Sequence, residues 1–306
     1  MENKNTIGHF SALFSILVWG TTFISTKVLL RDFQPIEILV FRFVIGLLIL
    51  IFIYPHRMKR RDINQEITFA LAGLCGVCMY YLLENIALTY TMASNVGVII
   101  SIAPFFTAIL THLFMKKEER LHLNFIIGFL VAMVGICFIS FNGSKLHLNP
   151  LGDFLAILAA LVWACYSVLT KKISSFGYHT VQTTRRVFSY GLIFMIPAMF
   201  VFQFKLRFDL ITKSINLLNI AFLGIGASAL CFVTWNYAVK LLGAVRTNIY
   251  IYMVPVITIF TSMLVLHERI TRVAMLGTIL TLLGLLISEN KFMIKKPLEN
   301  GVRIND

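Results

Sequence analysis

The sequence predicts an all-α integral membrane protein with ten transmembrane helices, arranged as two inverted five-helix repeats. Three observations lead to this prediction: the composition, ten long apolar runs and an internal repeat. Of the 306 residues, 58% are hydrophobic and only 13% are charged. About a quarter of the residues of a soluble domain are charged, so this chain has too few charges to cover a water-facing surface.

Ten apolar runs are long enough to cross a bilayer, which takes roughly 20 residues of α-helix. They cover residues 8–29, 36–55, 67–86, 93–115, 122–141, 152–172, 181–203, 215–236, 245–266 and 271–290. Buried helices of a large soluble core are the alternative, but almost nothing amphipathic remains to cover such a core. The first run lacks a basic leader and a small-residue cleavage site, so we expect a retained helix rather than a signal peptide. All five cysteines fall inside the runs, where we expect Cys75-x-x-Cys78 to pack helices rather than to bind a metal.

The basic residues of the connecting segments indicate the orientation. Lys and Arg in short loops mark the cytoplasmic side of a membrane protein. With the N-terminus inside, the inner segments hold more than twice as many of them as the outer segments. We therefore expect both termini in the cytoplasm. The formal net charge of +13 then reflects basic loops beside an anionic lipid leaflet, and no nucleic-acid partner is expected.

The two halves of the chain repeat one another. "LVWGTTFISTK" at residues 17–27 matches "LVWACYSVLTK" at residues 161–171, an offset of 144 residues. The offset becomes 151 and then 149 further along. The matched pairs include Trp19/Trp163, Arg42/Arg186, Asn85/Asn236, Pro104/Pro255, Glu119/Glu268, Gly128/Gly277 and Gly135/Gly284.

The number of helices in each copy determines the symmetry of the pair. Five is odd, so the second copy must enter the membrane from the opposite side. Inverted repeats of this kind are typical of secondary transporters, which bind their substrate near the bilayer midplane between the repeats. We expect a first five-helix repeat at residues 8–141, a second at 152–290 and a cytoplasmic tail at 291–306.

The motifs in this order resemble the EamA domain of the drug/metabolite transporter superfamily. The resemblance rests on Leu-Val-Trp-Gly-x-x-Phe at 17–23, Arg42-Phe43, Asn85-x-Ala87-Leu88, Pro104, Glu119 and the Gly128/Gly135 pair, and on their second copies. It covers residues 8–290, with Ala164 in place of the Gly of the first motif. The resemblance implies export of amino acids or related small metabolites across the cell membrane. Each EamA unit is expected to form one five-helix repeat.

We expect a central cavity among helices 1, 3, 4, 6, 8 and 9, whose faces carry polar and aromatic residues. The candidate substrate-binding residues are Trp19, Phe23, Arg42, Tyr80, Glu84, Ser101, Trp163, Tyr166, Asn248 and Tyr252. Aromatic walls suit an amphipathic or cationic ligand. For the Trp and Tyr residues, tight helix packing is the alternative, and small-residue packing is the alternative for the face that carries Ser101.

Charges inside the spans are costly and usually have a task. Glu84 is the one clear acid within a predicted span, and Lys27 and Arg42 are predicted in the same outer half of the membrane. The three can form an ion pair, or they can bind the charged ends of a substrate or carry a proton. Pro104 and Pro255 lie well inside their predicted helices, where each causes either a fixed bend or a flexible gating point.

The sequence thus predicts a secondary transporter that works as a monomer or weak homo-oligomer, in contact with membrane lipid and a small-molecule substrate. Import of a cationic or nucleotide-like metabolite, and a sensor or scaffold without transport, are the alternatives. No catalytic, phosphate-binding or metal-binding motif occurs in the sequence, so we expect no enzyme activity, catalytic residue, metal or cofactor.

Overall fold

The computed structural model describes residues 2–56, 58, 62–115, 123–140, 149–267 and 271–289. Glu119, Glu268 and the expected tail at 291–306 lie outside these residues. The described part of the chain is helical, without a β-strand.

The first half contains five spans, two of which are composed of shorter segments. Its elements are α1 (Glu2–Leu29), α2 (Pro35–Ile53), α3 (Ile63–Gly73), η1 (Leu74–Met79), α4 (Tyr80–Tyr90), α5 (Ala93–Ile100), α6 (Ala103–Phe114) and α7 (Leu123–Ser140). The third span runs through α3, η1 and α4, and the fourth through α5 and α6.

The second half repeats this order. Its elements are α8 (Pro150–Ser174), α9 (Thr180–Val201), α10 (Phe208–Ile211), α11 (Ser214–Ala221), η2 (Phe222–Leu230), α12 (Cys231–Leu242), α13 (Ala244–Asn248), η3 (Ile249–Met253), α14 (Val254–Val265) and α15 (Arg272–Glu289). The sixth, seventh and tenth spans are α8, α9 and α15; α11, η2 and α12 form the eighth, and α13, η3 and α14 form the ninth. The π-helical segments η1 and η2 occupy equivalent places in the third and eighth spans.

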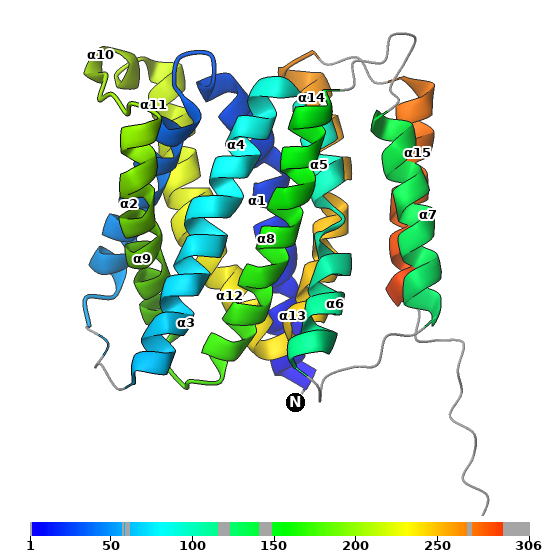
Figure 1. Cartoon of the computed structure of the whole chain (residues 1–306), viewed down its shortest axis with the longest axis horizontal. Coiled ribbons are helices and arrows are strands. Elements are labelled where there is room, and N and C mark those ends of the chain that lie inside the picture. The colour runs from blue at the N-terminus through cyan, green and yellow to red at the C-terminus, as the bar shows by residue number, and fades with distance from the viewer. Residues whose placement is uncertain are drawn as a thin grey trace, which may run out of the picture.

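The ten spans stand side by side and their directions alternate (Figure 1). Seven are long and apolar enough to cross a membrane on length and composition alone. The other three are α9, with 22 residues, and α7 and α15, with 18 each. The first residues of α1 and the last of α15 lie at the same end of the bundle (Figure 1). We call this the inner end and the opposite one the outer end, after the predicted orientation.

Contacts between loops demonstrate the inverted repeat. At the outer end, the α1–α2 loop meets the segment after α9, where Arg207 donates to the Asp32 carbonyl at 2.7 Å. At the inner end, the segment after α2 meets the start of α9, where Arg185 donates to the Tyr54 carbonyl at 2.6 Å. The first loop of each repeat is therefore at the opposite end from the first loop of the other.

The two repeats interlock rather than lying next to one another. α1 packs against α12 and α14, and its counterpart α8 packs against α4 and α6. α2 packs against η2, and its counterpart α9 against α3. Because these contacts occur in repeat-related pairs, the central core belongs equally to both halves.

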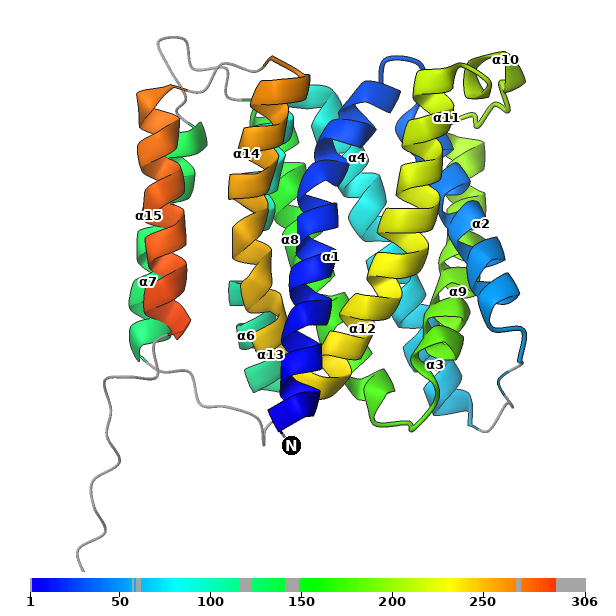
Figure 2. The same ribbon diagram turned by 180° about the vertical axis from the view of Figure 1, so that it is seen from behind.

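α7 and α15 form a separate pair at one side of the bundle (Figure 2). A Cβ atom on Gly135 would come 2.5 Å from the Gly277 carbonyl, and one on Gly284 would come 2.4 Å from the Gly128 carbonyl and the Ala132 nitrogen. Only glycine permits so close an approach of two helix backbones. The glycine pairs thus pack α7 and α15, the fifth and tenth spans, against each other and away from the centre.

The orientation can be tested with cysteines placed at the two ends. In a chain whose native cysteines have been replaced, Ser175→Cys lies in the inner α8–α9 loop and Ser214→Cys at the outer start of α11. We expect a membrane-impermeant maleimide added to intact cells to label the cysteine at position 214, and to label that at 175 only after permeabilisation. The reverse pattern would show that the orientation is wrong.

Candidate functional site

An aromatic cluster fills the centre of the bundle, where the two repeats meet. The repeat mates Trp19 and Trp163 lie edge to face, 5.3 Å between ring centroids. Trp235 lies 5.1 Å from Trp19, and Tyr80 and Tyr166 lie 4.9 and 5.1 Å from Trp163. Residues that are exchanged by a two-fold rotation can touch only beside its axis, so Trp19 and Trp163 mark the pseudo-symmetry axis of the protein.

Each of these two indoles is held by a hydrogen bond from its N–H group. Trp19 donates to the Ala227 carbonyl of η2 at 2.9 Å, and Trp163 to the Asn248 side-chain oxygen of α13 at 3.1 Å. A buried indole N–H without an acceptor would be costly. The two bonds join spans 1 with 8 and 6 with 9, and they hold both rings in one orientation.

A small cavity lies against this cluster. It is lined by Ile16, Trp19, Thr22, Phe23, Tyr80, Tyr81, Glu84, Ile100, Trp163, Ile251 and Val254. Its volume is about 20 Å³, which is enough for little more than one water molecule. The wall is contributed by spans 1, 3, 4, 6 and 9, and the protein is closed around the cavity in this conformation.

Glu84 supplies the acidic group of the cavity wall. The residue is 1% exposed, and its Oε1 atom has no hydrogen-bond partner. Tyr80, one helical turn earlier, also lines the cavity. A buried carboxylate oxygen without a donor is costly unless a ligand or water reaches it. Glu84 can therefore receive a hydrogen-bond donor or a positive charge from a bound molecule.

Arg42 lies one layer behind the cavity wall. Its Nε donates to the Ser228 hydroxyl at 3.0 Å, and its guanidinium carbon lies 4.2 Å from the centre of the Tyr81 ring. The Nη1 and Nη2 atoms are buried and have no hydrogen-bond partner. Arg42 thus does not line the cavity.

The direct ion pair that the sequence leaves open is absent from the described residues, because Glu84 is not within 4.0 Å of Arg42 or Lys27. Lys27 instead donates to the carbonyls of Leu88 and Thr91, at the end of the third span. Glu84 and Arg42, the two opposite charges nearest the cavity, therefore each keep buried polar atoms without a hydrogen-bond partner.

The other candidate residues fall into two groups. Trp19, Phe23, Tyr80 and Trp163 line the cavity together with Glu84, whereas Ser101, Tyr166, Asn248 and Tyr252 do not. Ser101 bonds the carbonyl of Val98 in its own helix, and Asn248 accepts from Trp163 and Ser167. Gly97, on the same face as Ser101, is a close contact with Thr258 rather than part of the wall.

Sequence reasoning missed several members of the wall. Thr22 is one turn from Trp19, so helical spacing could have found it. Ile100 and Ile251 are repeat mates, and each lies four residues before the proline of its span. Apolar residues of a membrane helix look alike in sequence, and only the break in the helix turns these two toward the centre.

Pro104 and Pro255 correct one expectation. The sequence places each inside a continuous helix, but each lies in the first turn of a second half-helix, α6 or α14. A tight turn at Ser101 and Ile102 precedes Pro104, and the 3₁₀ segment η3 precedes Pro255. The proline ring clashes with the carbonyl four residues earlier, so the regular helix ends before it. Spans 4 and 9 are thus broken beside the cavity, while a gating role for the prolines remains a proposal.

A second cavity lies on the inner side. Its volume is also about 20 Å³, and it is lined by Thr170, Ile173, Ser174, Tyr178, Thr180, Thr183, Val187, Asn236 and Lys240. Tyr166, which packs on Trp163, donates to the Asn236 side chain at 2.8 Å. The Tyr166–Asn236 pair therefore separates the central cavity from the inner one.

Among the described residues, no group of three His, Cys, Asp or Glu side chains could hold a metal ion.

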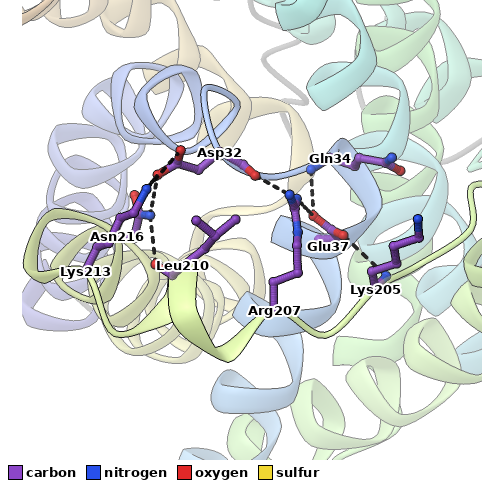
Figure 3. A network of polar contacts seen from close by, with 8 residues as sticks. All are labelled: Asp32, Gln34, Glu37, Lys205, Arg207, Leu210, Lys213 and Asn216. Atoms are coloured by element: carbon purple, nitrogen blue, oxygen red, sulfur yellow. Dashed lines mark hydrogen bonds and ion pairs between the residues drawn. The ribbon is translucent and has the colours of Figure 1, made fainter.

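The outer end is closed by a network that we call the outer clasp: Asp32, Glu37, Arg207, Lys213 and Asn216 (Figure 3). Arg207 pairs with the buried Glu37 carboxylate at 2.8 Å. Lys213 and Asn216 bind the Asp32 carboxylate at 3.3 and 2.7 Å. The clasp joins the α1–α2 connection and the first turn of α2 to the segment that runs from the end of α9 into the first turn of α11, one from each repeat.

A comparable network, the inner clasp, joins α3 to α9 at the inner end through Glu66, Arg186 and Tyr190. Glu66 accepts from Arg186 at 2.8 Å and from the Tyr190 hydroxyl at 2.6 Å. Arg186 is the repeat mate of Arg42. Equivalent positions of the two repeats therefore have different roles, because Arg186 belongs to the inner clasp and Arg42 lies behind the wall of the central cavity. Each clasp thus joins the two repeats at one end of the bundle.

Asp32 makes the outer clasp sensitive to acid. The hydrogen bonds from Asn216 and Lys213 lower the pKa of Asp32 below its ordinary value of 3.8. Its contribution to stability is complete above that ordinary value and is lost as the pH falls through the lower pKa of the folded state. In thermal unfolding at decreasing pH, Asp32→Asn should therefore lose less stability than the wild-type protein. Asp209→Asn, a change of equal charge in the same outer segment, should behave as wild type, and equal acid sensitivity in all three proteins would contradict the assignment.

Comparison with known proteins agrees with this architecture. The model of the EamA-like transporter family matches residues 6–141 and again residues 150–289. A solved crystal structure superposes with a TM-score of 0.71 over 93% of this chain and 98% of the other, at 17% identity, which shows a common fold.

The similar curated proteins are named as transporters. An uncharacterized transporter of Archaeoglobus fulgidus is 29% identical over 90% of this chain and 96% of its own. The uncharacterized transporter YyaM of Bacillus subtilis is 24% identical, over 92% and 93%. A protein of Escherichia coli named "Probable amino-acid metabolite efflux pump" is 26% identical, over 90% and 93%.

Proposed function

Because the chain belongs to the EamA-like transporter family, we propose that it exports amino acids or closely related metabolites across the cell membrane by alternating access. The observation that carries this proposal is the closed central cavity, in which Glu84 is the acid and aromatic residues make up half of the remaining lining. The protein is then a secondary transporter and not an enzyme, with both termini in the cytoplasm.

The chemistry of the wall favours a ligand with an ammonium group and an apolar body. The unpartnered Oε1 atom of Glu84 would accept from the ammonium group. The faces of Trp19, Tyr80 and Trp163 attract a cation and also pack against an apolar side chain. The positive charge of Arg42, behind Tyr81, would favour a carboxylate on the same ligand.

The direction of transport is argued from a relative and from the fold. The E. coli relative is named as an efflux pump. In alternating access, the inner clasp would open to admit substrate from the cytoplasm and the outer clasp would open to release it. The Tyr166–Asn236 pair would act as the inner gate between the two cavities.

A cationic metabolite without a carboxylate is the second candidate substrate. Glu84 and the aromatic faces suit it equally well, and import of such a compound would use the same cavity. A quaternary amine and a neutral α-amino acid, tested in the same assay, distinguish the two candidates, because only the amino acid gains from the charge of Arg42.

Counterflow of radiolabelled neutral α-amino acids into proteoliposomes tests the role of Glu84. Glu84→Gln keeps the size of the side chain but removes the charge that would hold the ammonium group. We expect counterflow to fall by about tenfold or more, since a hydrogen bond to a charged group contributes roughly 1.5–3 kcal/mol. Ser101→Ala, a buried polar residue that does not line the cavity, should retain transport. Wild-type counterflow by a normally folded Glu84→Gln variant would refute the proposal.

Filling the cavity tests its place on the transport path. Thr22→Phe adds a ring to a wall residue of a cavity with room for little more than one water molecule. Counterflow should be lost while the protein still inserts into the membrane and remains monodisperse in detergent. Thr21→Phe, on the adjacent residue that does not line the cavity, should transport. Equal transport by both variants would place the path elsewhere.

A further inference from the structure

A cavity of about 490 Å³ opens on the inner part of the bundle, between the end of α2 and the start of α9, far larger than the central one. Its lining residues are Ile51, Pro55, Met58, Gln182, Arg185, Arg186 and Ser189. We call it the α2–α9 groove. Apart from Arg186, which belongs to the inner clasp, its lining residues serve none of the steps derived above. Both α2 and α9 lie at the lateral edge of the bundle (Figure 1).

The groove combines basic groups with a surface that faces hydrocarbon. Arg185 and Arg186 contribute two positive charges, and Glu66, which pairs with Arg186, offsets only one. The outer faces of the same two helices are apolar, with Leu48 59% exposed on α2 and Ile193 55% exposed on α9. A molecule that fits both parts has an anionic head and apolar chains.

Arg185 is fixed in place before any ligand binds. Its Nη1 and Nη2 atoms donate to the carbonyls of Tyr54 and His56, at 2.6 and 2.8 Å. These two carbonyls follow α2, where the helix no longer satisfies them. The neutral carbonyls hold the guanidinium but leave its full positive charge.

The repeat provides an internal comparison for this groove. At the outer end, the positions equivalent to Gln182, Arg185 and Ser189 are Ile38, Phe41 and Ile45. There Phe41 packs against Phe33 and Phe204, with ring centroids 5.6 and 6.0 Å apart. The fold therefore accepts apolar side chains at these three positions. The polar side chains at the equivalent inner positions are a departure that the architecture does not require.

We propose that the α2–α9 groove binds an anionic phospholipid of the inner leaflet. The lipid phosphate lies beside Arg185 and Arg186, Gln182 and Ser189 contact the head group, and the acyl chains follow the apolar faces of α2 and α9. Basic pockets between helices at the cytoplasmic interface suit such head groups by charge. A bound lipid would also link α2 to α9, one helix from each repeat, beside the inner clasp.

Retention of phosphatidylglycerol by the purified full-length protein tests the proposal, with native mass spectrometry for bound lipid and thermal unfolding for its effect. We expect phosphatidylglycerol to be retained and to raise the melting temperature more than phosphatidylcholine does. Arg185→Gln should weaken phosphatidylglycerol binding by about fivefold, since one basic residue near an anionic lipid surface contributes roughly 1 kcal/mol. Lys205→Gln, which removes the same charge from an exposed outer position, should bind as wild type.

Ser189→Phe provides a variant that keeps both arginines and fills the groove. Ser189 bonds only the Arg185 carbonyl of its own helix, so this change should leave the fold intact. It should reduce retention of phosphatidylglycerol to the level of phosphatidylcholine. Equal binding of the two lipids by the wild-type protein, or wild-type retention by both groove variants, would overturn the proposal. Full stabilisation by inorganic phosphate alone would also overturn it, because the ligand would then be a free anion. None of these outcomes depends on which cargo the protein carries.

Discussion

A polar group that faces hydrocarbon cannot hydrogen-bond to water, and this cost governs the arrangement of the whole bundle. Glu84 and Arg42 are each 1% exposed, and the indoles of Trp19 and Trp163 donate to acceptors on other spans. The residues turned outward are apolar, such as Phe10 and Phe52 at 68% and 87% exposure. The polar content of the spans therefore collects at the interface between the two repeats, which is where a transporter needs it.

The inverted repeat explains the framework, and its departures from symmetry produce the chemistry. Trp19 and Trp163 keep equivalent roles beside the pseudo-symmetry axis. Arg42 and Arg186 do not, because one is buried against Tyr81 and the other pairs with Glu66 near the inner end. Glu84 has a tryptophan, Trp235, as its repeat mate. A symmetric copy would have placed charge on both sides of the axis, whereas this protein has one acid and one buried base on the same side.

The protein is closed at its centre, beside the broken spans 4 and 9, and a clasp joins the two repeats at each end. The breaks before Pro104 and Pro255 relax the regular hydrogen bonding of spans 4 and 9 beside the cavity. Both clasps connect one repeat to the other, so each must loosen if its own end is to open. Their composition differs: the outer clasp depends on two acids, Asp32 in the α1–α2 loop and Glu37 in the first turn of α2, and the inner one on the single acid Glu66. The two ends therefore need not respond equally to pH or salt.

The sequence by itself determined the membrane class, the ten spans and the inverted repeat, because these depend on composition and on matches at a constant offset. It also identified Trp19, Tyr80, Glu84 and Trp163 as residues near the centre, since buried charge and repeated tryptophan are visible in a single chain. Only the tertiary structure decided that Arg42 lies behind Tyr81, that Asn248 binds an indole, and that Ile100 and Ile251 line the cavity. These choices depend on helix rotation and on breaks in the helices. The packing of ten spans against one another sets both, and helical periodicity along one chain does not contain that information.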